Sequence, residues 1–503
     1  MKRVPAHRRK EEGGYILVLI AGSMTVLLSI AGLALDLGWW YREATKLQSA
    51  VDAAALAGVV YMPGNLSKAT STALTTMAKN DFATGAKGVV VTVSTVPGYS
   101  RRIKVCATDS NVEVYFTKVI GMSPIITKCA VAEYILPVAM GSPLNEMSLS
   151  TLGVWPAVNG YCSATEDGDE VLSGFRGMFP DHTWSTFTGC PPGGASGPPL
   201  GPNPLYDATG YNYIVDIKTA SATSIQVYDG EWHSAAGTID GNQGTGATVV
   251  DTTFKITWDN ATPLDTSDDV VMVTTTIPSR SAAHRNAWVT LYTAAAIGRY
   301  NVNVTVSTNA TSHGSNSFGL RASSGAFSLC STELAAANYS ATCPEVFADQ
   351  HLGVNAQVAS SVASFYLANV ESVYAGRQMT VGLFDPGEGG STIEILDPNG
   401  NPVSFTYSTV DDLPATIGAP FYSGSGTTID VSGLIPAQTY RRNRFKFNDR
   451  KVEAIVDLPS NYVALYGTKT WWKLRYTFGG GTVGDRTTWD VGITGDPVRL
   501  VLG

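Results

Sequence analysis

The chain has 503 residues, of which only 15% are charged, and its formal net charge at pH 7 is −8. This length allows two or three domains, and the negative balance excludes the basic surface with which proteins bind nucleic acid. Many glycine, serine, threonine and aromatic residues fit a secreted, β-rich protein better than a cytosolic enzyme.

A membrane-spanning helix is the first element that the sequence predicts. Residues 15–35 carry no charge and, at 21 residues, are long enough to cross about 30 Å of hydrocarbon. The ten residues at the start of the chain include five lysines or arginines and no acid. Because positive segments stay inside, we expect residues 1–13 to form a cytoplasmic tail. The chain is then a single-pass protein of the cytoplasmic membrane, with its N-terminus inside and its bulk extracytoplasmic.

The outer end of this span carries a polar and aromatic group of residues. Asp36 ends the apolar run, where interfacial water can solvate a carboxylate, and Trp39, Trp40 and Tyr41 follow it. Tryptophan and tyrosine are enriched where a membrane meets water. We therefore expect these four residues at the membrane interface, within one helix that covers residues 14–62.

Two segments carry a resemblance to a known family. The runs GLALDLGWWYR (residues 32–42) and LQSAVDAAALAG (residues 47–58) resemble the N-terminal signature of the TadE/TadG-like family of Flp (tight-adherence) pilus-assembly proteins. More weakly, VEVYFTKVIG (residues 112–121) followed by ITKCAVAE (residues 126–133) is similar to the strand–helix–strand piece that follows in such proteins. The resemblance covers about residues 14–137 and implies an inner-membrane-anchored accessory of pilus assembly, with no catalytic residue.

Three fates of the N-terminal segment remain open. Residues 31–34 can be fitted to the small-x-small pattern of a signal-peptide cleavage site, but the apolar core is long and helical character continues beyond it. Gly13 and Gly14 precede the apolar run as in a prepilin, yet Val18 or Leu19 stands where prepilins usually place glutamate. The sequence therefore favours an uncleaved anchor.

Residues 63–143 are predicted to form a small α+β unit close to the membrane. A helix is expected over residues 65–85, and strands over residues 88–96, 101–107 and 125–134. Residues 112–120 are expected to be helical or extended.

The rest of the chain is predicted to form two antiparallel β-sandwich domains of jelly-roll or immunoglobulin-like type, at residues 144–370 and 371–503. The Pro/Gly-rich residues 191–204 lie within the first of these domains and are expected to form a loop that precedes its β-type runs. Short β-type runs recur at the spacing of a sandwich. The first domain has them at 211–217, 224–228, 252–258, 270–277, 288–291, 299–307 and 317–322. The second group has them at 359–370, 378–384, 391–396, 444–448, 453–458, 471–478 and 488–493.

Six cysteines fit an oxidising compartment. Paired in chain order, they give Cys106 with Cys129, Cys162 with Cys190, and Cys330 with Cys343. Six cysteines permit fifteen connectivities, so this pairing rests on proximity.

No catalytic signature is present, and we predict that the chain is not an enzyme. It has no GxSxG, HExxH or Walker motif. Its GxGxxG string at residues 479–484 leads into a strand rather than a helix, which predicts a hairpin loop and no dinucleotide site. The histidines, His351 among them, lack partners at helical or strand spacing and are expected on the surface or in loops.

No cofactor is predicted, and calcium is the one ion that the sequence suggests. Asp259, Asp265, Asp268 and Asp269 lie in one oxygen-rich loop that can wrap a hard cation. Hairpin turns are also rich in aspartate for backbone reasons alone.

Aromatic residues are the other candidates for binding. Trp471 and Trp472 are adjacent, so in a strand they point to opposite faces and one of them can be exposed to stack on a sugar ring.

The sequence thus predicts a membrane-anchored, extracytoplasmic structural or adhesive accessory of a Flp pilus or related appendage. Its expected partners are the lipid bilayer and pilus-assembly or surface-appendage proteins. The alternative is a membrane-tethered carbohydrate-binding protein without a pilus role, for which glycans are the partners.

Overall fold

The computed structural model forms two compact units, residues 1–135 with 496–503 and residues 136–495. The residues that the structure describes are 13–62, 66–97, 99–121, 124–134, 138–148, 154–176, 201–228, 251–260, 268–278, 283–284, 287–307, 315–387, 391–410, 422–433, 446–481, 483–495 and 498–501.

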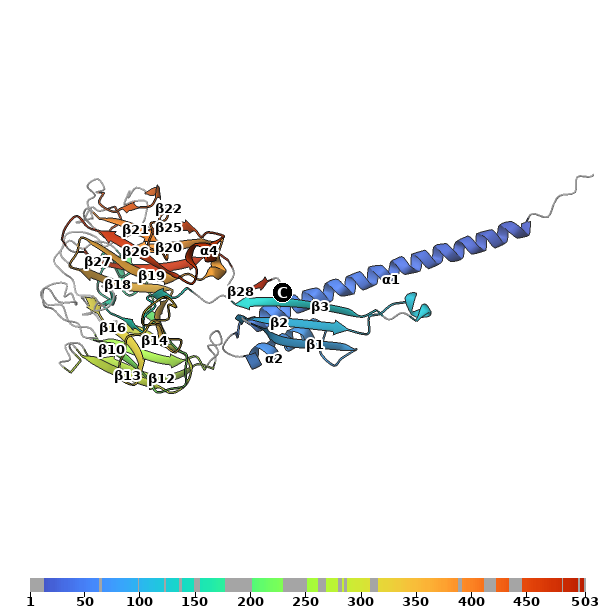
Figure 1. The fold of residues 1–503 in the computed structure, drawn as a ribbon, viewed down its shortest axis with the longest axis horizontal. Helices are drawn as coiled ribbons and strands as arrows, with labels where there is room; N and C mark the ends of the chain where they lie inside the picture. Colours follow the sequence, from blue (N-terminus) through green and yellow to red (C-terminus); the bar gives the residue numbers. More distant parts are fainter. Residues whose placement is uncertain are drawn as a thin grey trace, which may run out of the picture. The chain divides into compact units, whose positions relative to one another are not determined.

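A single long helix, α1 (Gly13–Val59), dominates the first unit (Figure 1). Its 47 residues extend for about 70 Å at 1.5 Å per residue, more than twice the thickness of a bilayer core. The side chains of residues 15–31 are all exposed. One helix in the described residues is therefore long and apolar enough to cross a membrane.

The second half of α1 packs on the membrane-proximal fold. Leu47, Val51 and Ala54 are fully buried at helical spacing, against α2 (Leu66–Lys79) and the sheet. The helices approach closely because Gly58 has no side chain, and a Cβ there would lie 2.7 Å from the Ala69 carbonyl oxygen. The alanine-rich sequence thus continues α1 as a core helix.

The sheet of this unit has four antiparallel strands. Their order is β1 (Val89–Val96), β2 (Tyr99–Asp109), β3 (Ile126–Tyr134) and β28 (Val498–Val501). The Cys106–Cys129 disulfide joins residues directly opposite each other on β2 and β3. Strand β28 comes from the far end of the chain, and no sequence pattern indicated its place.

A buried carboxylate fixes β28 to its neighbours. Glu133 on β3 accepts hydrogen bonds from Arg102 Nε at 2.9 Å and from Arg499 Nη2 at 2.8 Å. Burial alone raises the pKa of Glu133, but the hydrogen bonds and positive charges of Arg499 and Arg102 outweigh it and hold the pKa below its usual value.

The second unit is built from three main antiparallel sheets. The ten-stranded sheet has the order β12 (Val270–Ile277), β11 (Thr252–Trp258), β14 (Gly298–Val306), β9 (Tyr211–Ile217), β17 (Glu345–Asp349), β4 (Met140–Gly141), β19 (Val362–Asn369), β26 (Trp471–Thr477), β21 (Thr392–Leu396) and β24 (Ile429–Asp430). The eight-stranded sheet has the order β15 (Ser315–Ser317), β6 (Val154–Asn159), β18 (His351–Val358), β27 (Val483–Ile493), β20 (Gln378–Phe384), β25 (Lys451–Asp457), β22 (Phe405–Val410) and β23 (Ser423–Gly426). The four-stranded sheet has the order β13 (Trp288–Ala294), β10 (Thr223–Tyr228), β16 (Gly319–Ser324) and β5 (Glu146–Met147).

The described residues of this unit also form smaller elements. They are the strand pair β7 (Phe175–Arg176) and β8 (Gly201–Pro202), the short helix α4 (Tyr462–Tyr466) and the 3₁₀ turns η2 (Thr165–Asp167) and η4 (Ser372–Tyr374). The Cys330–Cys343 disulfide closes a loop between β16 and β17. Cys162 is also disulfide-bonded, and its predicted partner, Cys190, lies outside the described residues.

The sheets pack as β-sandwich layers with aromatic residues between them, which confirms the predicted fold class. Phe365 and Tyr476 of the ten-stranded sheet contact Trp489 of the eight-stranded sheet, with ring centroids 6.3 Å apart in both cases. Strands from both sides of residue 370 lie in the ten-stranded sheet. A boundary between two β domains at that residue stays a prediction.

Two local expectations are wrong. The described part of the expected strand at residues 444–448 forms a turn. The glycine-rich residues 479–481 belong to a connection between β26 and β27, which lie in different sheets, so this loop does not close a hairpin. The strand that follows still agrees with the absence of a dinucleotide motif, which needs a helix there.

Candidate functional site

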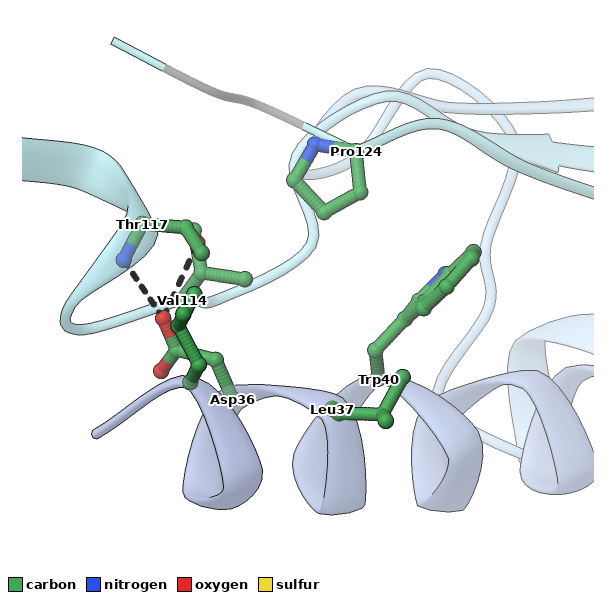
Figure 2. Close-up of a pocket in the computed structure, with 7 residues that line it drawn as sticks. Asp36, Leu37, Trp40, Val114, Thr117 and Pro124 are labelled. Carbon is green, nitrogen blue, oxygen red and sulfur yellow. Dashed lines mark hydrogen bonds between the residues drawn. The ribbon is translucent and has the colours of Figure 1, made fainter. Parts of the chain in front are cut away.

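Asp36 is buried under the loop of residues 112–121 in its own unit, whereas the sequence predicted that water would solvate it. Its exposed fraction is 3%, and its carboxylate accepts backbone N–H groups from Tyr115 at 2.9 Å, Phe116 at 2.8 Å and Thr117 at 2.6 Å. The Thr117 hydroxyl donates a fourth hydrogen bond at 2.9 Å, and Figure 2 shows Thr117 directly above Asp36. The expectation that interfacial water solvates Asp36 is therefore wrong.

The contact explains why this position holds a carboxylate. The N–H groups at the start of a helical turn have no partner within the turn, and an acidic side chain is a favourable acceptor for them. Asp36 supplies that acceptor to η1 (Thr117–Ile120) from a separate helix. It thereby fixes the loop of residues 112–121 on α1.

Gly32 completes the docking position one helical turn before Asp36. Residues four apart lie on the same face of a helix, and a Cβ at Gly32 would lie 2.6 Å from the ring of Phe116. Only a residue without a side chain lets that ring come so close to the helix. Gly32 and Asp36 are both part of the run GLALDLGWWYR, whose spacing thus has a geometric reason.

An open, largely apolar cavity of about 470 Å³ lies beside this contact. Leu33, Asp36, Leu37, Trp40, Val114, Thr117 and Pro124 line it (Figure 2). Its two polar side chains, Asp36 and Thr117, bond to each other. The cavity has the volume of a small-ligand pocket. Its one carboxylate, Asp36, already accepts four hydrogen bonds, and the rest of the lining is largely apolar, so the cavity suits an apolar side chain or an acyl chain.

The aromatic residues that follow Asp36 differ in their surroundings. Trp40 and Tyr41 are 42% and 75% exposed, as residues at a membrane interface are expected to be. Trp39 instead contacts Tyr115 edge-on, with ring centroids 6.1 Å apart, and Arg42 lies 4.8 Å from its ring centroid. Trp39 therefore helps to fix the same loop, and the interfacial placement of all four residues stays a prediction.

The calcium candidates do not form a described cluster of three ligands. Asp259 Oδ1 accepts a hydrogen bond from the Arg299 N–H at 3.1 Å, and Asp268 Oδ2 accepts one from Asn260 Nδ2 at 3.3 Å. Asp269 follows Asp268 in the described chain, and Asp265 lies outside the described residues. Calcium at this loop stays a prediction.

The expectation that Trp471 or Trp472 is exposed is wrong. Their exposed fractions are 3% and 0%, because both faces of β26 are covered. Trp472 Nε1 donates to the Tyr462 hydroxyl at 2.9 Å, and the Trp471 ring packs edge-on against Tyr366. Neither residue offers a face for a sugar.

Sequence reasoning missed the partners of Asp36. Residues 114–117 were expected only to be helical or extended, because nothing local shows that their N–H groups point at a carboxylate about 80 positions away. The one sequence signal for this contact is the weak family similarity of residues 112–121, which singles out the loop but not its partner.

Two solved structures that match this chain have TM-scores too low to support an argument about its fold. The N-terminal CBM22-1–CBM22-2 tandem domain of Xyn10C from Paenibacillus barcinonensis matches with 10% identity and a TM-score of 0.10, covering 84% of this chain and 93% of that chain. The infectious bursal disease virus Gx strain structure matches with 9% identity and a TM-score of 0.10, covering 56% and 69%. Among curated proteins, none matches.

A family profile does match, and it falls on the site. The Tad family, described as "Putative Flp pilus-assembly TadE/G-like", matches residues 14–60, which lie within α1 or directly after it. Gly32 and Asp36 both fall in this range, while the weaker similarity at residues 112–133 lies outside it. The N-terminal region of this chain is therefore similar to the TadE/G-like Flp pilus-assembly family, as the sequence predicts.

Proposed function

We propose that this protein is a membrane-anchored, extracytoplasmic accessory of a Flp (tight-adherence) pilus or a related surface appendage, with a structural or adhesive role and no catalytic one. One observation carries the proposal. The family similarity at residues 14–60 includes both Gly32 and Asp36, which hold the loop of residues 112–121 on α1. The residues that carry the family similarity therefore include those that hold this loop on α1.

The exposed half of α1 supports the anchor. Its most apolar 18-residue window has a mean hydropathy of 2.4 and is 6% buried within the protein. An apolar surface of this size needs a membrane or another protein to cover it. The positive residues before it orient the N-terminus toward the cytoplasm, so the two units that follow are extracytoplasmic.

The cavity beside Asp36 is where we place the contact with pilus-assembly partners. Leu33 and Leu37 line it and are 50% and 59% exposed, at the level where the charge-free run ends. A neighbouring membrane helix would meet this surface without breaking any hydrogen bond, since Asp36 and Thr117 already satisfy each other. Van der Waals packing then supplies the attraction.

Site-specific photo-crosslinking in the native cells tests the proposal. A photoreactive residue replaces Leu37 in the cavity, and a matched control replaces Val90, which is 57% exposed on β1 of the same unit. We expect the Leu37 position to capture a pilus-assembly component, identified by mass spectrometry, and the Val90 position not to capture it. Recovering peptidoglycan-processing or nutrient-uptake proteins alone at Leu37 would contradict the proposal.

Protease protection tests the orientation separately. In intact spheroplasts, we expect external protease to digest the residues after Asp36 and to spare an epitope tag fused to the N-terminus. Protection of the β-rich unit until the membrane is lysed would exclude an extracytoplasmic role.

A further inference from the structure

Three metal-ligating side chains meet inside the β-rich unit, away from the site described above. They are Glu170, from the segment between η2 and β7, His351 at the start of β18, and Asp490 on β27. One possible ligand atom from each lies within 4.8 Å of those of the other two. No pattern in the sequence indicated this group. His351 was expected in a loop or at the surface, and it lies half-buried at the start of strand β18 instead.

Strand pairing brings two of the three together. His351 and Asp490 are directly opposite in the β18–β27 ladder, so their side chains leave the same face of the eight-stranded sheet. Asp490 in turn is opposite Gly382 on β20, where a Cβ would lie 2.2 Å from Asp490 Oδ2. The glycine therefore leaves the space that the carboxylate occupies.

A fixed loop delivers the third side chain. The Glu170 N–H donates to Thr488 Oγ1 at 3.0 Å, and Thr488 Oγ1 donates to the Gly168 carbonyl oxygen at 2.8 Å. The neighbouring Asp169 carboxylate accepts the N–H groups of Val171 at 3.0 Å and Leu172 at 2.8 Å. Residues 168–172 are thus held on the sheet by contacts that do not use the Glu170 side chain, which is the arrangement that a prepared ligand site requires.

The buried polar atoms of the group lack sufficient partners. Glu170 is 2% exposed, and neither of its carboxylate oxygens accepts a hydrogen bond in the part of the chain that the structure describes. His351 Nδ1 is also buried without a hydrogen-bond partner there. Lys451 Nζ lies 3.4 Å from Glu170 Oε1 and 2.7 Å from Asp490 Oδ2. One ammonium therefore contacts both carboxylates, and the charge of Arg176 also acts on Glu170. Buried charges of this kind are normally paired or bound to metal.

We propose that Glu170, His351 and Asp490 bind a divalent transition-metal ion, for which zinc is the probe. One imidazole and two carboxylates suit such an ion, whereas calcium and magnesium prefer oxygen ligands throughout. With metal–ligand distances of about 2.1 Å, the ligand atoms must come to about 3.4 Å from one another. The side chains reach that spacing by closing in when Lys451 moves off the carboxylates. The metal then clamps residues 168–172 to β18 and β27. This inference is independent of the role in pilus assembly.

Zinc binding to the purified full-length protein in detergent tests the proposal. After removal of metal with a chelator, we expect one equivalent of zinc to bind per chain and to raise the unfolding temperature of the β-rich unit by several degrees. Cobalt(II) in place of zinc should give the visible absorption of a low-symmetry site with a nitrogen ligand. The variants Glu170→Gln and His351→Gln should each weaken zinc binding by about 100-fold or more, since loss of even a supporting residue costs 10–100-fold.

Two further variants separate a metal site from a buried ion pair. Lys451→Met removes the competing ammonium, so zinc should bind at least as tightly as in the unchanged protein. Glu453→Gln alters a carboxylate that lies two residues after Lys451 on β25. It should leave zinc binding unchanged. Absence of stoichiometric zinc binding, or equal binding by His351→Gln and Glu453→Gln, overturns the proposal. If Glu170→Gln fails to fold, the zinc titration of His351→Gln and the cobalt spectrum of the unchanged protein decide whether the metal site exists.

Discussion

Replacing Asp36 by alanine should release the loop of residues 112–121 from α1. The substitution removes the acceptor of four hydrogen bonds, three of them from backbone N–H groups. Hydrogen bonds to a charged group contribute about 1.5–3 kcal/mol each. The full sum is not lost, however, because Tyr115 and Phe116 are 61% and 49% exposed and water reaches the released loop. The cost is therefore closer to the upper end of what losing a helix cap costs, about 2 kcal/mol.

A loss of about 2 kcal/mol raises the undocked population of the loop about 30-fold. Hydrogen exchange measured by mass spectrometry on the protein in detergent reports this directly, since the amides of Tyr115, Phe116 and Thr117 are the donors. Asp36→Asn keeps one acceptor oxygen and should give an intermediate increase. Leu35→Ala is the matched control, because Leu35 is the neighbouring residue and is 66% exposed. Unchanged exchange at residues 115–117 in Asp36→Ala would refute the reasoning.

Three other substitutions test separate parts of the structure. Gly32→Ala places a Cβ 2.6 Å from the Phe116 ring and should speed exchange of the same loop; normal exchange would show that the ring does not lie on the helix. Glu133→Gln weakens the ion pairs with Arg499 and should speed exchange at residues 498–501. Since the folded-state pKa of Glu133 is lowered, the stability that it contributes is present above its unfolded pKa and is lost as pH falls through the folded pKa. On acidification, the exchange rate at residues 498–501 in the unchanged protein should therefore approach the rate in the variant. A difference in rate that stays constant with pH would contradict this. Trp472→Phe removes the hydrogen bond to Tyr462 and leaves a void, so denaturant titration should show a loss of about 1–3 kcal/mol in the β-rich unit; no loss would mean that the indole is not packed there.

Local patterns in the sequence were sufficient for most strands of the β-rich unit. The expected bounds of β9 (Tyr211–Ile217), β11 (Thr252–Trp258) and β12 (Val270–Ile277) agree with the structure. In β9 every second residue is buried, and such alternation is visible in the sequence without knowledge of the partner strand. Strand β18 (His351–Val358) was missed although apolar residues stand at every second position of its sequence, because glycine and small or polar residues between them weaken the strand signal.

The candidate site and the proposed metal site depend instead on contacts between distant positions. Asp36 could be singled out as a charge at the end of an apolar run, but its partners are 79 to 81 residues away. Glu170, His351 and Asp490 come from three separate segments that only the sheet register brings together. A pattern search over short windows therefore finds Asp36 in the first site but not its partners, and it finds no residue of the second site.

The pairing of β28 with β3 makes the β-rich unit an insertion. The chain leaves the membrane-proximal sheet after β3 and returns as the adjacent strand β28, where Val498 is opposite Tyr134. Residues 136–495 thus occupy the position of a very large hairpin loop between neighbouring strands. Two covalent connections join the units, so a mechanical load on the β-rich unit is shared by two strands of one sheet. An insertion with its ends side by side can also be exchanged or enlarged in evolution without altering the fold that holds the anchor.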